Sequence, residues 1–300
     1  MLTRRTFGKV AVAALARPAR ALAAWADSTI SGVRLGVQTY SFRELPRAPA
    51  GNAVDAIVRA MTECGLSECE LFAPQVEPPL GPGRGPASTE AREAMRKWRL
   101  ETPLDYFRAI AQTFRSAGIS IYAYNYSFNS SFTDAEIDRG FEMTKALGAE
   151  IITASTTLDV ARRVVPFAER HQTVVAMHGH SRIEPNEFAT PESFAAAMKM
   201  SKYFKVNLDI GHFTAANFDP VAYIREHHAD ITNLHLKDRK RNQGDNLAWG
   251  RGDTPIREVL RLLKRERWPI RAYIEYEYRG EGTPVDEVKA CLAYARQALA

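Results

Sequence analysis

The sequence predicts an α/β protein with a single (β/α)8 TIM barrel domain, and two patterns predict it. Short runs rich in β-branched and aromatic residues recur along the chain, and amphipathic stretches with apolar residues at i, i+3 and i+4 spacing separate them. Strands that alternate with helices favour parallel βαβ units, and about 250 residues built in this way close most simply into a barrel. A doubly wound sheet is the alternative, but no Gly-x-Gly-x-x-Gly turn follows the first strand.

The expected strands are spread over the chain, with no internal repeat beyond the alternation and no domain linker. They cover residues 33–40, 68–72, 120–126, 150–154, 173–178, 205–209, 231–235 and 271–275. Apolar residues at 54, 57, 58 and 61, and at 256, 259, 260 and 263, mark two of the helices between them. The one long irregular segment, 73–87, is rich in Pro and Gly, and loops of this length are typically functional or mobile.

The composition is that of a soluble globular chain. Its 300 residues are 45% hydrophobic and 25% charged, which excludes a disordered polymer and a coiled coil. No apolar run reaches the ~20 residues that a membrane span needs, so we expect no stable membrane insertion. The formal net charge of +5 equals the five positive charges of the first 24 residues, which contain no acidic residue. Residues 25–300 are therefore formally neutral, and we expect no nucleic-acid partner.

The first 24 residues have the layout of an export signal. Arg4 and Arg5 are followed by Phe7 and Lys9, then by an apolar run over 10–16 and the small-x-small sequence Ala21-Leu22-Ala23. This segment resembles a twin-arginine leader, although Gly8 replaces the usual bulky residue. The resemblance implies a signal peptide over 1–24, a barrel over 25–300 and a periplasmic location. A cytoplasmic location is the alternative if the segment is only a basic N-terminus.

Cysteine usage fits that reading of the leader. Cys64, Cys69 and Cys291 are odd in number and have no metal-type spacing. Twin-arginine export carries proteins that have already folded in a reducing compartment, so disulfides are not required. We expect all three to be small core residues.

Function in a barrel of this type is expected at the carboxyl ends of the strands. Four of the last strands deliver one polar residue each to that rim, namely His178, Asp209, His235 and Glu275. Mixed imidazole and carboxylate ligands suit Mn²⁺, Co²⁺, Zn²⁺ or Fe²⁺ better than a purely oxygen-binding ion. The sequence therefore predicts a divalent-metal site formed by these four residues.

From Gly36 to its end the chain resembles the xylose isomerase-like TIM barrel superfamily, broadly described as sugar phosphate isomerases and epimerases. The motifs that carry the resemblance are Asp209-Ile210-Gly211-His212, His235-Leu236-Lys237-Asp238, Gly250-Arg251-Gly252-Asp253-Thr254-Pro255, Glu275, the opening Gly36-Val37-Gln38-Thr39-Tyr40-Ser41-Phe42 and Glu70-Leu71-Phe72. In relatives such as ketose 3-epimerases, Glu, Asp, His and Glu hold the metal. Here His178-Gly179-His180 stands where the first glutamate is usual, so His178 replaces that carboxylate.

The resemblance also implies a mechanism and further site residues. The reaction it implies is proton abstraction α to a carbonyl with a metal-stabilised enediolate, in which Glu275, His212 and Lys237 are the candidate catalytic residues. Export favours an unphosphorylated small-molecule carbohydrate as the substrate. Residues expected to contact it are Glu70, His180, Gln38, Tyr40, Trp249 and Arg251.

Four functions follow from these observations. The first is a metal-dependent sugar isomerase or epimerase, and the second is a metal-dependent lyase or hydratase on 3-keto-type sugars or glycosides, because the replacement by His178 leaves only one of the paired glutamates. An apurinic endonuclease and a non-catalytic sugar-binding barrel are minor alternatives; the former would need extra ligands, but no His precedes residue 171. A homo-oligomeric state is left open.

Overall fold

The computed structural model describes residues 27–47, 51–79 and 88–300. The predicted leader over 1–24 lies outside the described residues, as does the 80–87 part of the Pro- and Gly-rich segment. Across the described ranges, no helix combines the length and apolar character of a membrane span.

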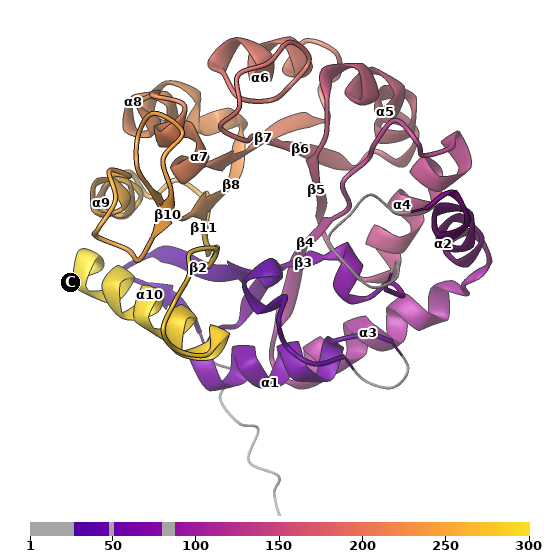
Figure 1. Ribbon diagram of the computed structural model, residues 1–300, viewed down its shortest axis with the longest axis horizontal. Coiled ribbons are helices and arrows are strands. Elements are labelled where there is room, and N and C mark those ends of the chain that lie inside the picture. Colours follow the sequence, from indigo (N-terminus) through magenta and orange to yellow (C-terminus); the bar gives the residue numbers. More distant parts are fainter. Residues whose placement is uncertain (1–26, 48–50, 80–87) are drawn as a thin grey trace, which may run out of the picture.

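Eight parallel strands form a closed barrel, as the sequence predicts. Each hydrogen-bonds to the next in chain order, and the first of them, β2, pairs with both β3 and the last, β11, which closes the ring (Figure 1). The strands are β2 (Val33–Gln38), β3 (Glu68–Phe72), β4 (Ser120–Asn125), β5 (Ile151–Ser155), β6 (Val174–His178), β7 (Phe204–Asp209), β8 (Ile231–Leu236) and β11 (Arg271–Ile274).

Helices form an outer ring around the strands (Figure 1). The amphipathic pattern explains their placement, because the apolar residues of α9, among them Val259 and Leu260, are buried. Threonine side chains cap several helices; Thr133, Thr190 and Thr283 each form a capping box. The helices are α1 (Val54–Cys64), α2 (Thr89–Glu101), α3 (Leu104–Ser116), α4 (Asp134–Ala146), α5 (Leu158–His171), α6 (Pro191–Met198), α7 (Ile210–Ala215), α8 (Pro220–His227), α9 (Ile256–Glu266) and α10 (Pro284–Leu299).

Short elements complete the chain at the two ends of the barrel. A two-residue strand pairs antiparallel with the start of β2, and a small antiparallel pair follows β8. The elements are β1 (Thr29–Ile30), β9 (Asp238–Arg239), β10 (Asn246–Leu247) and the 3-10 turns η1 (Thr39–Phe42), η2 (Ala73–Gln75) and η3 (His228–Asp230).

The amino ends of the strands are closed by packing. The ring of Tyr273 fills the space beside Gly36, where a Cβ atom would lie 2.5 Å from Tyr273 Cε1. Tyr273 Oη donates to Glu68 Oε1 at 2.8 Å. Because side chains alternate along a strand, Glu275 lies on the same face as Tyr273, two residues nearer the carboxyl end. The barrel thus has an aromatic plug at one end and polar groups at the other.

All three cysteines are buried and none forms a disulfide. Cys64 is 6% exposed, Cys69 is fully buried and Cys291 is 1% exposed. Their expected role as small core residues is confirmed.

Candidate metal centre

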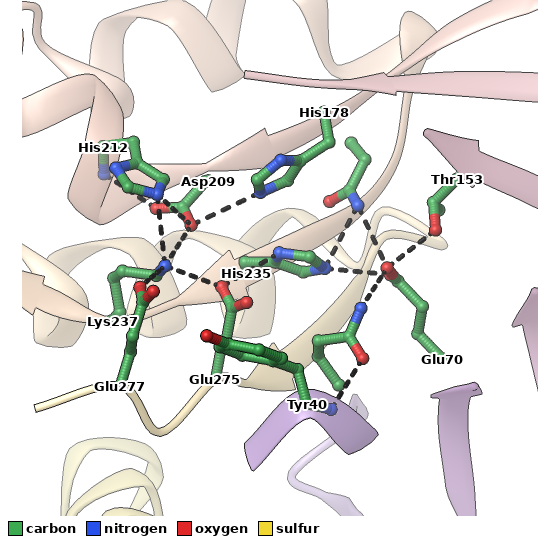
Figure 2. Close-up of polar contacts among 12 residues, drawn as sticks. Tyr40, Glu70, Thr153, His178, Asp209, His212, His235, Lys237, Glu275 and Glu277 are labelled. Carbon is green, nitrogen blue, oxygen red and sulfur yellow. Dashed lines mark hydrogen bonds and ion pairs between the residues drawn. The ribbon is translucent and has the colours of Figure 1, made fainter. Parts of the chain in front are cut away.

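The four residues expected to bind a metal come together at the carboxyl ends of the strands. His178 ends β6, Asp209 ends β7, His235 lies in β8 and Glu275 directly follows β11. One ligand atom from each lies within 4.8 Å of those of the others, and Figure 2 shows the side chains around a common centre. All four residues are less than 8% exposed.

Their free atoms have the chemistry of a metal site. His178 Nε2, Asp209 Oδ2, His235 Nδ1 and Glu275 Oε2 are all buried, and none of them makes a hydrogen bond of good geometry among the described residues. Their ionic neighbours belong to the site itself: Lys237 Nζ lies beside both carboxylate oxygens, and His235 Nδ1 lies 3.1 Å from Glu275 Oε2. Buried polar atoms are normally hydrogen-bonded, so four buried donor atoms that converge without such a bond need an explanation. Two imidazoles and two carboxylates fit a divalent transition-metal ion, which would satisfy all four atoms at once.

Contacts behind the ligands fix the direction in which three of them point. Ser155 Oγ lies 3.0 Å from His178 Nδ1, and the backbone N–H of His212 donates to Asp209 Oδ1 at 2.7 Å. His235 Nε2 lies 2.9 Å from Glu70 Oε2. In each case the ligand's other polar atom is held by the protein, which leaves its free atom facing the centre.

Glu70 occupies a different place from the one expected. Its side chain is fully buried in the middle of β3, rather than at the strand end, and it lies beneath His235 instead of lining the cavity. Burial alone would raise the pKa of Glu70, but His235 and the surrounding hydrogen bonds outweigh burial and lower it. The side chains that donate to its carboxylate are Gln38, Thr153, Asn125, Asn207 and Asn233. We therefore assign Glu70 to the support of His235 and not to sugar contact.

Of these partners of Glu70, only Gln38 was predicted from the sequence, as a substrate contact; Asn125, Asn207, Asn233 and the Thr153 hydroxyl were not. Asn207 and Asn233 each precede a ligand by two residues, so strand periodicity places them on the ligands' face, one step deeper in the barrel. A search for polar residues at that spacing would have found them.

Lys237 lies among the carboxylates of the site. Its Nζ atom is 3.1 Å from Asp209 Oδ2 and 2.9 Å from Glu275 Oε2, and it also pairs with Glu277 (Figure 2). Burial would lower the pKa of Lys237, but these three carboxylates raise it. The ammonium group therefore stays charged and partly neutralises the acidic ligands. His212 Nε2 lies 3.3 Å from the same Nζ atom.

Asp238 explains the motif at 250–255. Its carboxylate accepts backbone N–H groups from Gly250 at 2.7 Å, Gly252 at 2.9 Å and Thr254 at 3.2 Å. A Cβ atom at residue 252 would lie 2.0 Å from Asp238 Oδ1, so only glycine fits the loop as it stands. Through Asp238 this motif holds a loop against β9, directly after β8, and it supplies no group to the candidate metal centre.

A cavity of about 310 Å³ opens over the cluster. Six of the expected catalytic and substrate-binding residues line it, namely Gln38, Tyr40, His180, His212, Lys237 and Glu275, together with the expected ligands His178 and His235. Glu277 also lines it and was missed, although its spacing of two residues from Glu275 was a usable signal.

Two expected substrate contacts lie elsewhere. Trp249 packs edge-on against Tyr294 of α10, and Arg251 lines a further cavity beside β10, which shares Glu277 with the cavity over the cluster. Both sit in the loop that Asp238 fastens, and neither belongs to the cavity over the cluster. The structure gives them no contact with the candidate metal centre.

The fold and the site together define a class of protein: a (β/α)8 barrel with a His/Asp/Glu donor cluster at the carboxyl ends of its strands. More narrowly, the chain belongs to the Xylose isomerase-like TIM barrel family, whose model matches residues 58–298.

Solved structures with the same fold include enzymes with different names. D-psicose 3-epimerase from Clostridium cellulolyticum H10 is 14% identical, with 88% of this chain and 99% of that chain covered and a TM-score of 0.63. The probable 3-DHS dehydratase AsbF from Bacillus anthracis is 14% identical, with 86% and 97% covered and a TM-score of 0.60. The IOLI protein, solved with a bound zinc atom, is 14% identical, with 88% and 97% covered and a TM-score of 0.64. At these identities the likeness establishes the fold alone. No curated protein matches the sequence.

Proposed function

We propose that the protein is a divalent-metal-dependent isomerase or epimerase of an unphosphorylated sugar, acting by proton abstraction next to a carbonyl. The observation that carries this proposal is the convergence of four buried donor atoms within 4.8 Å of one another, beneath a cavity of about 310 Å³. The bound cation would polarise the substrate carbonyl and stabilise negative charge that develops on its oxygen. Mn²⁺, Co²⁺, Zn²⁺ or Fe²⁺ would suit this donor set, and the zinc in IOLI supports a metal here.

The residues around the cluster divide the remaining work. Glu275 presents its carboxylate to the cavity and is the candidate base that removes the proton. Lys237 and His212 line the same cavity and can bind substrate oxygens. The charge pattern favours a neutral sugar, because Lys237 is the only Lys or Arg among the described lining residues and three carboxylates already surround it.

One observation favours the lyase or hydratase alternative. Ser155 holds His178 toward the candidate metal centre, where the family usually has a glutamate. Glu275 is therefore the only glutamate among the four candidate ligands. Epimerisation with two bases needs groups on both faces of the reacting carbon, whereas elimination of water needs one base next to the carbonyl. The dehydratase name of a structural neighbour supports the same alternative.

Product analysis in deuterated solvent separates the two reactions. Purified, metal-loaded protein is incubated with a panel of keto and aldo sugars, and the products are followed by NMR and mass spectrometry. An isomer of unchanged composition with deuterium next to the carbonyl supports the isomerase. A product that differs from its substrate by one water supports the lyase or hydratase. No reaction and no exchange with any sugar, by protein that binds metal, would overturn both.

We also propose that the barrel is exported to the periplasm. The support is the Arg4-Arg5 segment with its apolar run and small-residue cleavage sequence. Cell fractionation tests this location with Arg4→Lys/Arg5→Lys as the matched variant. Retention of the variant but not of the wild type in the cytoplasm supports it, and equal distribution of both contradicts it.

A further inference from the structure

A second cavity adjoins the cavity over the candidate metal centre. It has a volume of about 240 Å³ and lies at the amino end of α5, between the segment after β4 and the segment after β6. Ser155 and His180 line both cavities. A molecule that reaches past these two residues would therefore occupy both spaces at once.

Thr156, in the wall of the second cavity, carries a hydroxyl that the fold does not use. Thr156 Oγ1 is buried and has no hydrogen-bond partner among the described residues, and Thr156 lines this cavity. A buried hydroxyl without a partner is uncommon, so a ligand that hydrogen-bonds to it would remove the penalty. Asn129 and Ser130, both exposed, add polar groups, and Val160 gives the wall an apolar part.

The charges of the lining select the kind of ligand. No Lys or Arg belongs to the described lining of the second cavity, and Glu187 places a carboxylate there. No described residue forms a hydrogen bond or an ion pair with that carboxylate. A phosphate or carboxylate on the ligand would be repelled. A neutral ring with many hydroxyl groups would instead donate hydrogen bonds to Glu187 and pair with Thr156.

We propose that the substrate is a glycoside, with its reacting sugar over the metal cluster and a neutral hexosyl ring in the second cavity; this rests on the proposed function. The second cavity, at about 240 Å³, has the volume of roughly eight water molecules at ~30 Å³ each, which is room for one hexosyl ring. Because Ser155 and His180 line both cavities, the two spaces are neighbours, as two covalently linked rings require. The second ring binds by hydrogen bonds and does not take part in the chemistry.

Binding of matched sugars tests this proposal. The probes are D-fructose and three disaccharides that attach a hexosyl group to different hydroxyls of fructose: turanose, lactulose and isomaltulose. Calorimetric Kd values are measured with metal-loaded protein. We expect at least one disaccharide to bind about tenfold more tightly than fructose. A Kd for every disaccharide that is equal to or weaker than that of fructose would overturn the proposal.

A steric variant and its matched control show where the second ring binds. Ser130 is exposed on the wall of the second cavity, so Ser130→Trp should fill that cavity, whereas Ser130→Ala adds no bulk. We expect Trp to abolish the disaccharide advantage while the Kd of fructose is unchanged, and Ala to retain the advantage. An advantage that survives Ser130→Trp would contradict the assignment of the cavity.

Thr156→Val tests the hydrogen bond itself. The substitution keeps the shape and removes the hydroxyl, and folding loses no hydrogen bond because Oγ1 has no partner in the fold. Disaccharide binding should weaken by roughly three- to tenfold, with fructose unaffected. Deuterium exchange measured in the same samples keeps the two proposals separate. Exchange without a disaccharide advantage refutes only the second ring site, and tight disaccharide binding without exchange or product refutes only the proposed reaction.

Discussion

The imidazole Nε2 of His235 lies 2.9 Å from a carboxylate oxygen of Glu70, a residue 165 positions earlier in the chain. The other ring nitrogen, Nδ1, lies 3.1 Å from Glu275 Oε2 at the candidate metal centre. Burial would lower the pKa of His235, but the carboxylates of Glu70 and Glu275 raise it well above the usual histidine range. Glu70, which is fully buried inside the barrel, thus holds the His235 ring in its orientation toward the candidate metal centre.

Glu70→Gln should weaken metal binding without removing a ligand. Outer partners of metal-bound histidines typically change affinity by about 10–100-fold when mutated, and we expect a loss in that range by calorimetric titration. Glu68→Gln is the matched control, because Glu68 lies on the same strand but contacts Tyr273 and Arg271 at the opposite end of the barrel. Equal effects of the two variants would show that Glu70 has no special relation to the metal.

Lys237→Met should change metal affinity and folding stability in opposite directions. Without its ammonium group, the buried carboxylates of Asp209 and Glu275 lose their cationic partner, which should destabilise the metal-free protein by about 3–5 kcal/mol. The metal should bind more tightly, because it no longer competes with a neighbouring positive charge. Chemical unfolding with and without metal measures both effects. Lys205→Met is the control, because Lys205 pairs with Asp230 at the amino end of β7; it should change neither the metal affinity nor the stability strongly. Weaker metal binding by Lys237→Met would contradict this account.

Glu136 gives stability a defined dependence on pH. Burial would raise its pKa, but hydrogen bonds from Arg96 and the backbone of Thr133, with Arg99 nearby, lower it below the ordinary value of 4.5. A lowered pKa in the folded state contributes stability that is present above the unfolded pKa and is lost as the pH falls through the folded pKa. Urea unfolding should therefore show a large deficit for Glu136→Gln at pH 7 and a smaller one in acid. A deficit that grows on acidification would contradict the pKa direction.

The thiols should be unreactive in the folded protein. Burial raises the pKa of Cys64 to about 11 and that of Cys291 to about 12, and it raises the pKa of Cys69 well above its usual value. At pH 8 only about one Cys64 in a thousand would be a thiolate, which is the reactive form. A disulfide reagent should label all three cysteines in guanidinium chloride and label the native protein far more slowly. Rapid native labelling would show that a thiol is accessible.

Strand periodicity predicted both the barrel and the convergence of His178, Asp209, His235 and Glu275 at its rim. The eight expected strands match the observed ones within two residues at each end, and residues at the strand ends met because parallel strands finish at one rim. Glu70 could not be placed in this way: it lies mid-strand and is held by partners from five other strands, and sequence spacing carries no information on such contacts. The position of Trp249 and Arg251 outside the lining of the cavity over the cluster could not be predicted for a similar reason, since the path of their loop is set by three backbone bonds to Asp238.

Metal content combined with anomalous diffraction tests the central claim most directly. We predict one divalent cation per chain, bound between His178, Asp209, His235 and Glu275, with stoichiometric binding lost in Asp209→Ala. A metal position centred on other residues, or no binding of Mn²⁺, Co²⁺, Zn²⁺ or Fe²⁺ by folded wild-type protein, would contradict the account.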